Sequence, residues 1–162
     1  MPLVVEDGSN VPNANSYVTR ADYIAFAKAR GTVVPDDETA DENLINAMDY
    51  LNIQCVKGEA AYRDQALPFP RYGLVEGDRQ APFVIPTNIK LAQMQLGLDV
   101  RSGVNLLPSR SAEPQVKREK VGPIETEFFA PASYMPNIPL AAALLAPFQC
   151  GQGGFRLKTY RA

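Results

Sequence analysis

Proline is distributed unevenly along this chain, and its placement limits what each part can form. Half of the 14 prolines lie between Pro108 and Pro147. A proline inside a helix removes a backbone hydrogen bond and clashes with the preceding turn, so we expect no helix there longer than about two turns. The prediction is a mainly α protein: a small helical bundle with a short β segment and an extended, proline-rich C-terminal arm. We place the helical body at 1–109, the extended or β segment at 110–129, and a C-terminal docking arm at 130–162.

The segment TRADYIAFAKARG is typical of a first helix. Thr19 is a suitable N-cap, and Asp22 lies near the positive end of the helix dipole. Gly31 is a natural residue just past the C-terminus. The face that we expect to be apolar contains Ala21, Ile24, Ala25 and Lys28.

A second helix follows an acidic linker. Thr39 and Glu42 have the spacing of a capping box, which predicts Thr39 as the N-cap. The amphipathic stripe that follows consists of Leu44, Ile45, Met48 and Leu51. The acids before and at the start of this helix have two interpretations, a metal cluster or a solvated linker at a helix N-terminus, and the second is favoured. These acids are Asp36, Asp37, Glu38, Asp41 and Glu42.

Residues 56–85 have no helical pattern. Pro68 and Pro70 favour an extended path, and we expect Phe69 and Tyr72 to attach this loop to the helices. Arg71 has two interpretations: it caps a helix end within the fold, which is favoured, or it binds a carboxylate of a partner.

The third helix has the clearest pattern, with Pro86 at or near its first position. One apolar face contains Ile89, Ala92, Leu96 and Val100, and another contains Leu91, Met94 and Leu98. A helix that is apolar on two faces is usually central in a bundle or flanked by a neighbouring subunit. Gly97 indicates a close approach by another helix. We expect a common core made of Leu44, Ile45, Met48, Leu51, Ile89, Ala92 and Leu96.

The sequence offers no convincing catalytic constellation. It contains no histidine, which excludes Ser-His-Asp and Cys-His sites and every histidine-based metal site. No two carboxylates share a helix face at a spacing typical of acid–base work. Cys55 and Cys150 follow no metal-binding spacing, and free thiols are favoured over a disulfide. We therefore expect a protein that is not an enzyme and has no catalytic, cofactor-binding or metal-binding residues.

Charge is divided between the two parts of the chain. Residues 1–109 carry 9 basic and 14 acidic side chains, which gives −5, and residues 110–162 carry 7 basic and 4 acidic side chains, which gives +3. The N-terminus lacks the basic region and long apolar run of a signal peptide, so we expect synthesis in the cytoplasm without a membrane partner. The basic and aromatic residues at the C-terminus suit single-stranded nucleic acid or an acidic protein surface equally well. They are Phe155, Arg156, Lys158, Tyr160 and Arg161.

The stretch VKREKVGPIETEFF, residues 116–129, places charges of both signs in one short segment. As a hairpin centred on Gly122-Pro123, it would oppose Lys120 to Glu125 and Arg118 to Glu127. Gly-Pro is a poor two-residue hairpin loop, because proline suits the first central position rather than the second. The alternative is an extended arm whose edge pairs with another chain. In either case Ile124, Thr126 and Phe128 should share one face of a strand.

Several pieces of the sequence occur together in a known family. They are NANSYVTRADYIAFAKARG, LINAMDYLN, VKG, QALPFPRYGL, IPTNIKLAQMQLGL and VKREKVGPIETEFF, in this order over residues 3–129. On these pieces the chain resembles small tailed-phage proteins that are labelled DnaT-like single-stranded-DNA-binding proteins. Those proteins are similar to the head-tail connector adaptors, or head-completion proteins, of long-tailed phages. Members commonly have tryptophan near VKG and PFPR, where this chain has Val56 and Phe69.

The resemblance implies a structural virion protein. Such an adaptor forms a ring, expected to be a dodecamer, beneath the portal protein in the phage neck. Downstream tail or neck proteins bind below it, and double-stranded DNA passes through its lumen without specific binding. The alternative function is a DnaT-like single-stranded-DNA-binding protein. We expect the interfaces with neighbouring subunits or partners to use Arg118, Lys120, Ile124, Glu125, Glu127, Phe128, Phe155, Arg156, Tyr160 and Arg161.

Overall fold

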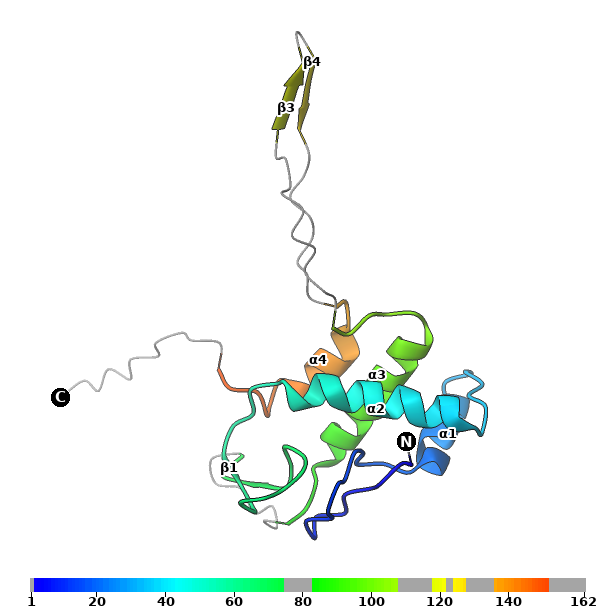
Figure 1. Cartoon of the computed structure of the whole chain (residues 1–162), viewed down its shortest axis with the longest axis vertical. Coiled ribbons are helices and arrows are strands. Elements are labelled where there is room, and N and C mark those ends of the chain that lie inside the picture. The colour runs from blue at the N-terminus through cyan, green and yellow to red at the C-terminus, as the bar shows by residue number, and fades with distance from the viewer. Residues whose placement is uncertain (1, 75–82, 108–117, 122–123, 128–135, 152–162) are drawn as a thin grey trace, which may run out of the picture.

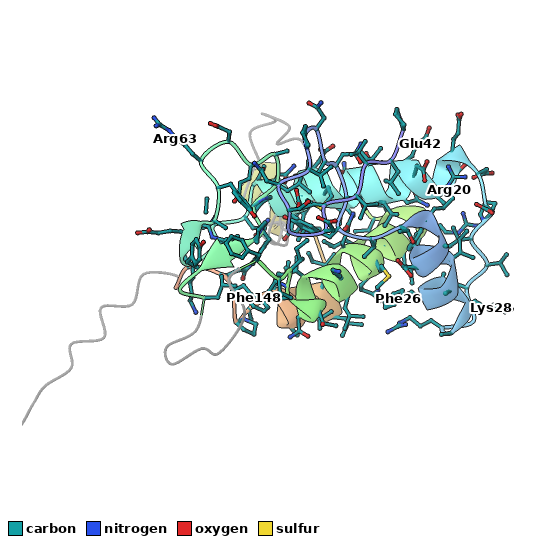
Figure 2. All side chains as sticks on the ribbon, turned by 90° about the horizontal axis from the view of Figure 1, so that it is seen from below. Arg20, Phe26, Lys28, Glu42, Arg63 and Phe148 are labelled. Carbon is teal, nitrogen blue, oxygen red and sulfur yellow. A yellow bond between two sulfur atoms is a disulfide. The ribbon has the colours of Figure 1, made fainter. Side chains whose placement is uncertain are left out.

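The protein is mainly helical, as predicted (Figure 1). The computed structural model describes residues 2–74, 83–107, 118–121, 124–127 and 136–151. Within these ranges the elements follow in the order α1, α2, β1, β2, α3, β3, β4 and α4. The helices form one body, with α3 in contact with the other three helices. Lys28 and Arg63 project from opposite ends of this body (Figure 2).

Helix α1 (Arg20–Lys28) begins at the predicted cap. The Thr19 side chain accepts a hydrogen bond from the backbone N–H of Asp22, and the Asp22 side chain binds the Thr19 backbone in return. The predicted apolar face is wrong, because the buried residues are Tyr23, Phe26 and Ala27. Two aromatic side chains bury more surface than the alanines of the predicted face, so they decide which side faces the core.

Helix α2 (Glu38–Asn52) begins before Thr39, so the prediction of Thr39 as N-cap is wrong. Asp37 is the cap, and its carboxylate accepts a hydrogen bond from the backbone N–H of Thr39 at 2.9 Å. Asp37 has an extended backbone, which leaves its side chain free to reach the first turn. The buried stripe is confirmed for Leu44, Met48 and Leu51, whereas Ile45 is only half-buried.

Helix α3 (Thr87–Arg101) is central in the bundle, as its two apolar faces predict. Pro86 is its N-cap, and the helix packs against α1, α2 and α4. A side chain at Gly97 would lie 3.1 Å from the Tyr23 ring, tighter than ordinary van der Waals contact. Gly97 therefore admits an aromatic side chain of α1 rather than the backbone of a second helix.

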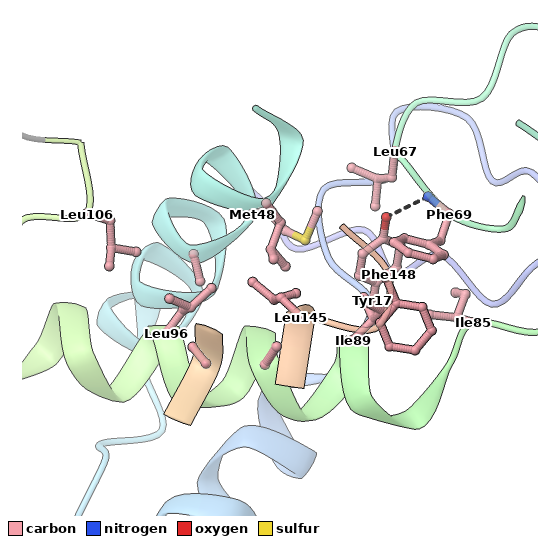
Figure 3. Packing of buried hydrophobic residues seen from close by; sticks show 14 of the residues in the cluster. Tyr17, Met48, Leu67, Phe69, Ile85, Ile89, Leu96, Leu106, Leu145 and Phe148 are labelled. Carbon is pink, nitrogen blue, oxygen red and sulfur yellow. Dashed lines mark hydrogen bonds between the residues drawn. The ribbon is translucent and has the colours of Figure 1, made fainter. Parts of the chain in front are cut away.

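The main core lies between α2, α3 and α4 (Figure 3). Leu96 is fully buried in it and belongs to the same cluster as Met48 and Leu145. A second cluster, around Tyr23 and Leu44, fills the space between α1, α2 and α3. Of the seven residues predicted to form the core, all except Ile45 are buried, and Leu44 belongs to the second cluster.

Helix α4 (Pro139–Leu145) belongs to the body. Ala141, Leu145 and Phe148 are buried in the main core, with Phe148 only 7% exposed. The expectation that residues 130–162 dock on a neighbouring protein instead of their own body is therefore wrong for residues 136–151. The apolar surface of this short helix is large enough to cover α3 in the same chain.

Cys55 and Cys150 form a disulfide, so the expectation of free thiols is wrong. Their Cα atoms are 5.4 Å apart, across 95 residues of sequence. The backbone N–H of Cys150 donates to the Cys55 carbonyl at 2.9 Å, and that of Lys57 donates to the Phe148 carbonyl at 2.8 Å. This backbone pairing brings the two thiols together.

Two short antiparallel strands close the loop between α2 and α3. They are β1 (Glu59–Ala60) and β2 (Arg71–Tyr72). The Arg71 guanidinium donates to the carbonyls of Lys57 and Gly58 at 2.7 Å and 2.6 Å. Arg71 thus holds loop carbonyls within the fold, so the favoured expectation that it caps a helix end is wrong. Phe69 is buried as expected, whereas Tyr72 is 42% exposed.

The second pair of strands is β3 (Arg118–Val121) and β4 (Ile124–Glu127). Among the described elements, β3 and β4 contact only each other (Figure 1).

Candidate functional site

The predicted interface segment forms a β-hairpin. Strands β3 and β4 pair antiparallel, with Arg118 opposite Glu127 and Lys120 opposite Glu125. This is the register of the hairpin interpretation, which is therefore confirmed, and the single extended arm is wrong. Opposite charges at directly paired positions stabilise such a ribbon by a few tenths of a kcal/mol each.

The register also assigns each position to a face of the hairpin. Residues alternate between the two faces along a strand, and paired residues lie on the same face. The charged pairs Arg118–Glu127 and Lys120–Glu125 therefore share one face. The pairs Glu119–Thr126 and Val121–Ile124 occupy the other, so Ile124 and Thr126 share a face as predicted.

Five predicted interface residues lie on this hairpin, and five do not fall in the described part of the chain. The five on the hairpin are Arg118, Lys120, Ile124, Glu125 and Glu127. Outside the described residues are Phe128, Phe155, Arg156, Tyr160 and Arg161.

The two pieces NSYV and PFPR meet in the core. The hydroxyl of Tyr17 accepts a hydrogen bond from the backbone N–H of Phe69 at 2.9 Å. Asn15 anchors the N-terminal segment, because its Oδ1 accepts from the Val4 N–H at 2.7 Å and its Nδ2 donates to the Pro2 carbonyl at 3.0 Å. These pieces of sequence therefore support the fold.

Gln93 is a fully buried polar residue that the sequence interpretation missed. Its Oε1 accepts from the Tyr17 N–H at 2.9 Å, and its Nε2 donates to Ser16 Oγ at 2.9 Å and to the Leu44 carbonyl at 3.2 Å. The sequence does contain a signal for this buried amide, because a glutamine stands between the apolar residues Ala92 and Met94 on a helix that is apolar on two faces. Because its amide is fully bonded, Gln93 links α3 to α2 and to the N-terminal segment and is not aimed at a ligand.

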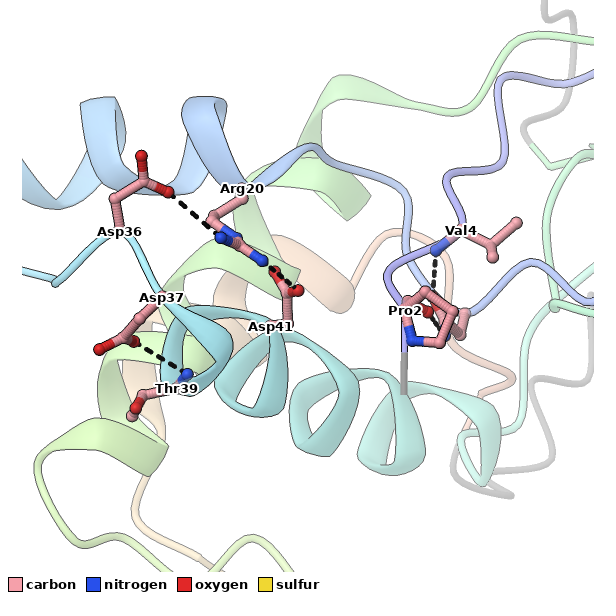
Figure 4. A network of polar contacts seen from close by, with 8 residues as sticks. Pro2, Val4, Arg20, Asp36, Asp37, Thr39 and Asp41 are labelled. Atoms are coloured by element: carbon pink, nitrogen blue, oxygen red, sulfur yellow. Dashed lines mark hydrogen bonds and ion pairs between the residues drawn. The ribbon is translucent and has the colours of Figure 1, made fainter.

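Three of the five acidic residues around the start of α2, Asp36, Asp37 and Asp41, bind protein groups (Figure 4). The Arg20 guanidinium donates to both carboxylate oxygens of the buried Asp41, at 2.8 Å and 2.6 Å, and to Asp36 at 3.4 Å. The hydrogen bond from Arg20 holds the pKa of Asp41 below its ordinary value. Asp37 caps α2, and the other acidic residues except Asp41 are exposed, as the linker interpretation predicts. Asp41 is buried against Arg20, so the expectation of a solvated side chain is wrong there. Across the described ranges, no group of three histidine, cysteine or acidic side chains could hold a metal ion.

Several basic side chains of the body are also engaged internally. Besides Arg20 and Arg71, Arg30 stacks over the Phe26 ring at 3.4 Å and donates to the Phe26 carbonyl. The Lys57 ammonium donates to the Pro147 carbonyl at 3.1 Å. These four cations are therefore held by groups of the body itself.

Three aromatic rings form a surface cluster at one end of the body. Phe83 packs against Tyr62 and Tyr72, with ring centroids 5.6 Å and 6.0 Å apart. Phe83 is 46% exposed. The sequence interpretation had placed Tyr72 against the helices and missed Phe83 as a surface residue.

A groove lies beside the disulfide, lined by Tyr50, Gln54, Ile138 and Gln149 among others. Its lining contains no carboxylate and no cation.

Comparison with known proteins places the chain in a family. Residues 1–162 match the family described as "Putative DnaT-like ssDNA binding protein". The chain belongs to this family. The match includes the segment after Phe129, beyond the 3–129 range on which the resemblance rested. No curated protein and no solved structure matches the chain.

Among the described residues of this family member, no helix is long and apolar enough to cross a membrane.

Proposed function

We propose that this chain is a structural virion protein, a head-tail connector adaptor that forms a ring between portal and tail. The observation that carries the proposal is the β3–β4 hairpin. Among the described elements, its two strands contact only each other, and their paired positions carry opposite charges. A two-stranded hairpin alone is marginally stable in water, so a partner surface would stabilise it.

The chemistry of the body supports a structural role. Asp36 and Asp41 are engaged by Arg20, and Asp37 is engaged by the N-terminus of α2. The buried amide of Gln93 is satisfied within the core. An adaptor requires a rigid body and docking segments, and no reacting group. The net charge of −5 over residues 1–109 suits a surface past which double-stranded DNA moves without binding.

The partners of this adaptor are other copies of the chain, the portal protein and downstream tail or neck proteins. In this proposal the hairpin binds a neighbouring copy. The basic-aromatic residues Phe155, Arg156, Tyr160 and Arg161 bind an acidic surface of another connector protein. The ring resides in the neck of the virion, and its subunits are made in the host cytoplasm.

A second candidate function is single-stranded-DNA binding, favoured by the family description and by the same C-terminal residues. Aromatic rings stack on bases, and the exposed Phe83 and Tyr72 would add a second stacking surface. The internal contacts of Arg20, Arg30, Lys57 and Arg71 weigh against this function, because they leave fewer cations of the body for phosphates.

Two measurements on the purified full chain separate these functions. Native mass spectrometry with negative-stain imaging reports the oligomer, and fluorescence anisotropy with a labelled oligothymidine reports DNA binding at low and physiological salt. We expect rings, and weak DNA binding that disappears at moderate salt. A monomer that binds the oligonucleotide with sub-micromolar affinity at physiological salt would overturn the adaptor proposal.

A further inference from the structure

The outer edges of the β3–β4 hairpin face no other described element. In an antiparallel pair, every second residue of each strand directs its N–H and C=O away from its partner strand. Such edges are templates for a further strand from another chain. The question is which strand of a second copy each edge selects.

Charge on the two edges is segregated by strand. On the charged face, β3 contributes Arg118 and Lys120, and β4 contributes Glu125 and Glu127. One edge of this face is therefore positive at two positions, and the opposite edge is negative at two positions.

A second hairpin can extend the antiparallel sheet in three ways. Pairing β3 with β3 of a second copy places cations beside cations, and pairing β4 with β4 places carboxylates beside carboxylates. Like charges directly opposite one another destabilise a sheet. Pairing β4 with β3 of the next copy places Glu125 and Glu127 beside the cations of that copy.

The three pairings also differ in symmetry. The two like-charged pairings use the same edge twice, so they produce closed two-fold dimers. The oppositely charged pairing uses two different edges, so each added copy leaves one positive and one negative edge open. Repetition of this contact gives a ring if the rotation closes.

We propose that the hairpins associate head to tail, with β4 of each copy pairing antiparallel with β3 of the next, to form one continuous sheet around the assembly. This inference rests on the proposed ring and names the edge and the partner strand that close it. Neighbouring strands lie about 4.8 Å apart, so each copy adds about 9.6 Å to the circumference of this sheet.

The test separates pairing within a hairpin from pairing between copies. The fourfold variant Arg118→Glu, Lys120→Glu, Glu125→Lys, Glu127→Lys exchanges the charges of the two strands. Opposite charges still face one another inside its hairpin and between two copies of the variant. At a junction between the variant and the wild type, however, every β4–β3 contact opposes like charges.

We expect the variant and the wild type each to form rings alone, and not to mix statistically within one ring. Contacts of β4 with β4 or of β3 with β3 between the two chains are opposite in charge, but they are two-fold contacts that do not continue a head-to-tail ring. The two chains are refolded together and their oligomers are weighed by native mass spectrometry, with one chain labelled with heavy isotopes. The matched control exchanges four exposed charges of the body, Lys28→Glu, Arg63→Glu, Glu42→Lys and Asp49→Lys, and it should mix statistically with the wild type.

The other possible outcomes contradict either the edge pairing alone or the edge pairing together with the ring. Statistical mixing of the fourfold variant with the wild type would overturn the edge pairing but not the proposed ring. The same holds if the fourfold variant fails to assemble alone while the body control assembles. If the wild type stays monomeric under every condition, the proposed ring and the edge pairing both fall.

Discussion

The Tyr17 hydroxyl accepts a hydrogen bond from the backbone N–H of Phe69 at 2.9 Å, although 52 residues separate them in the sequence. Both residues are buried, and their rings meet edge to face with centroids 6.2 Å apart. Burial raises the pKa of the Tyr17 hydroxyl above its ordinary value. This contact attaches the loop between α2 and α3 to the N-terminal segment.

Replacing Tyr17 with phenylalanine tests this contact. The variant keeps the ring but leaves the buried N–H of Phe69 without an acceptor, which should lower the free energy of unfolding by about 1–3 kcal/mol. Chemical denaturation followed by circular dichroism measures the loss. Tyr72→Phe, at a 42% exposed residue, is the control and should change little. Equal stability of Tyr17→Phe and wild type would show that the Tyr17 hydroxyl does not support the loop.

Leu96 tests the core between α2, α3 and α4. Because this side chain is fully buried, Leu96→Ala should cost about 2–5 kcal/mol through lost burial and a cavity. Thermal and chemical denaturation report the change. Leu140→Ala on α4, where the leucine is 50% exposed, should cost much less. An unchanged melting temperature for Leu96→Ala would contradict the central position of α3.

The Arg20–Asp41 pair predicts how stability depends on pH. The pKa of Asp41 is lower in the folded chain than its ordinary value of 3.8, so the ionised carboxylate stabilises the fold above that pH. This contribution should be lost as the pH falls through the folded pKa. The difference in unfolding free energy between wild type and Asp41→Asn should therefore be constant from neutral pH to about pH 5 and shrink below about pH 4.

Melting curves between pH 7 and pH 2 measure this dependence. Asp36→Asn is the control, because the Asp36 side chain is 78% exposed and lies farther from Arg20. Its effect should stay within about 0.5 kcal/mol at every pH. A pH-independent difference between wild type and Asp41→Asn would show that the ion pair does not contribute to folding.

Two truncations locate the boundary between body and tail. Deleting 148–162 removes Phe148 from the core and Cys150 from the disulfide, so it should destabilise the fold by at least about 3–5 kcal/mol. Deleting 152–162 retains both residues and should leave the melting temperature nearly unchanged. In the adaptor proposal the shorter deletion impairs incorporation into particles. Equal melting temperatures for both truncations would contradict the placement of Phe148 in the core.

Charge reversal on one strand tests the hairpin itself. Glu125→Lys with Glu127→Lys places four cations on one face, so it should weaken the hairpin and assembly. Adding Arg118→Glu and Lys120→Glu should partly restore assembly. Size-exclusion chromatography with light scattering measures the oligomer, and circular dichroism should show an unchanged helical body in both variants. A double-lysine variant that assembles like the wild type would exclude a role for these pairs.

Signals that act over a few residues could be read directly from the sequence. The N-cap at Thr19, the prolines after Pro108 and the apolar stripes of α2 and α3 each depend on hydrogen bonds or spacing within one element. The register of the hairpin belongs to the same class, because Arg118 and Glu127 are close in sequence and opposite in charge. These signals determined the mainly helical class and the candidate interface.

The remaining features were decided by contacts between distant segments. Residues 55–57 and 148–150 pair across the fold and bring Cys55 and Cys150 together, and no spacing in the sequence indicates that pairing. Tyr23 fixes the buried face of α1 because Gly97 of α3 leaves room for its ring. Helix α4 could have covered α3 or a neighbouring protein with the same apolar surface. Hydrophobic burial has no direction of its own, so only the complete tertiary arrangement determines which apolar surfaces meet.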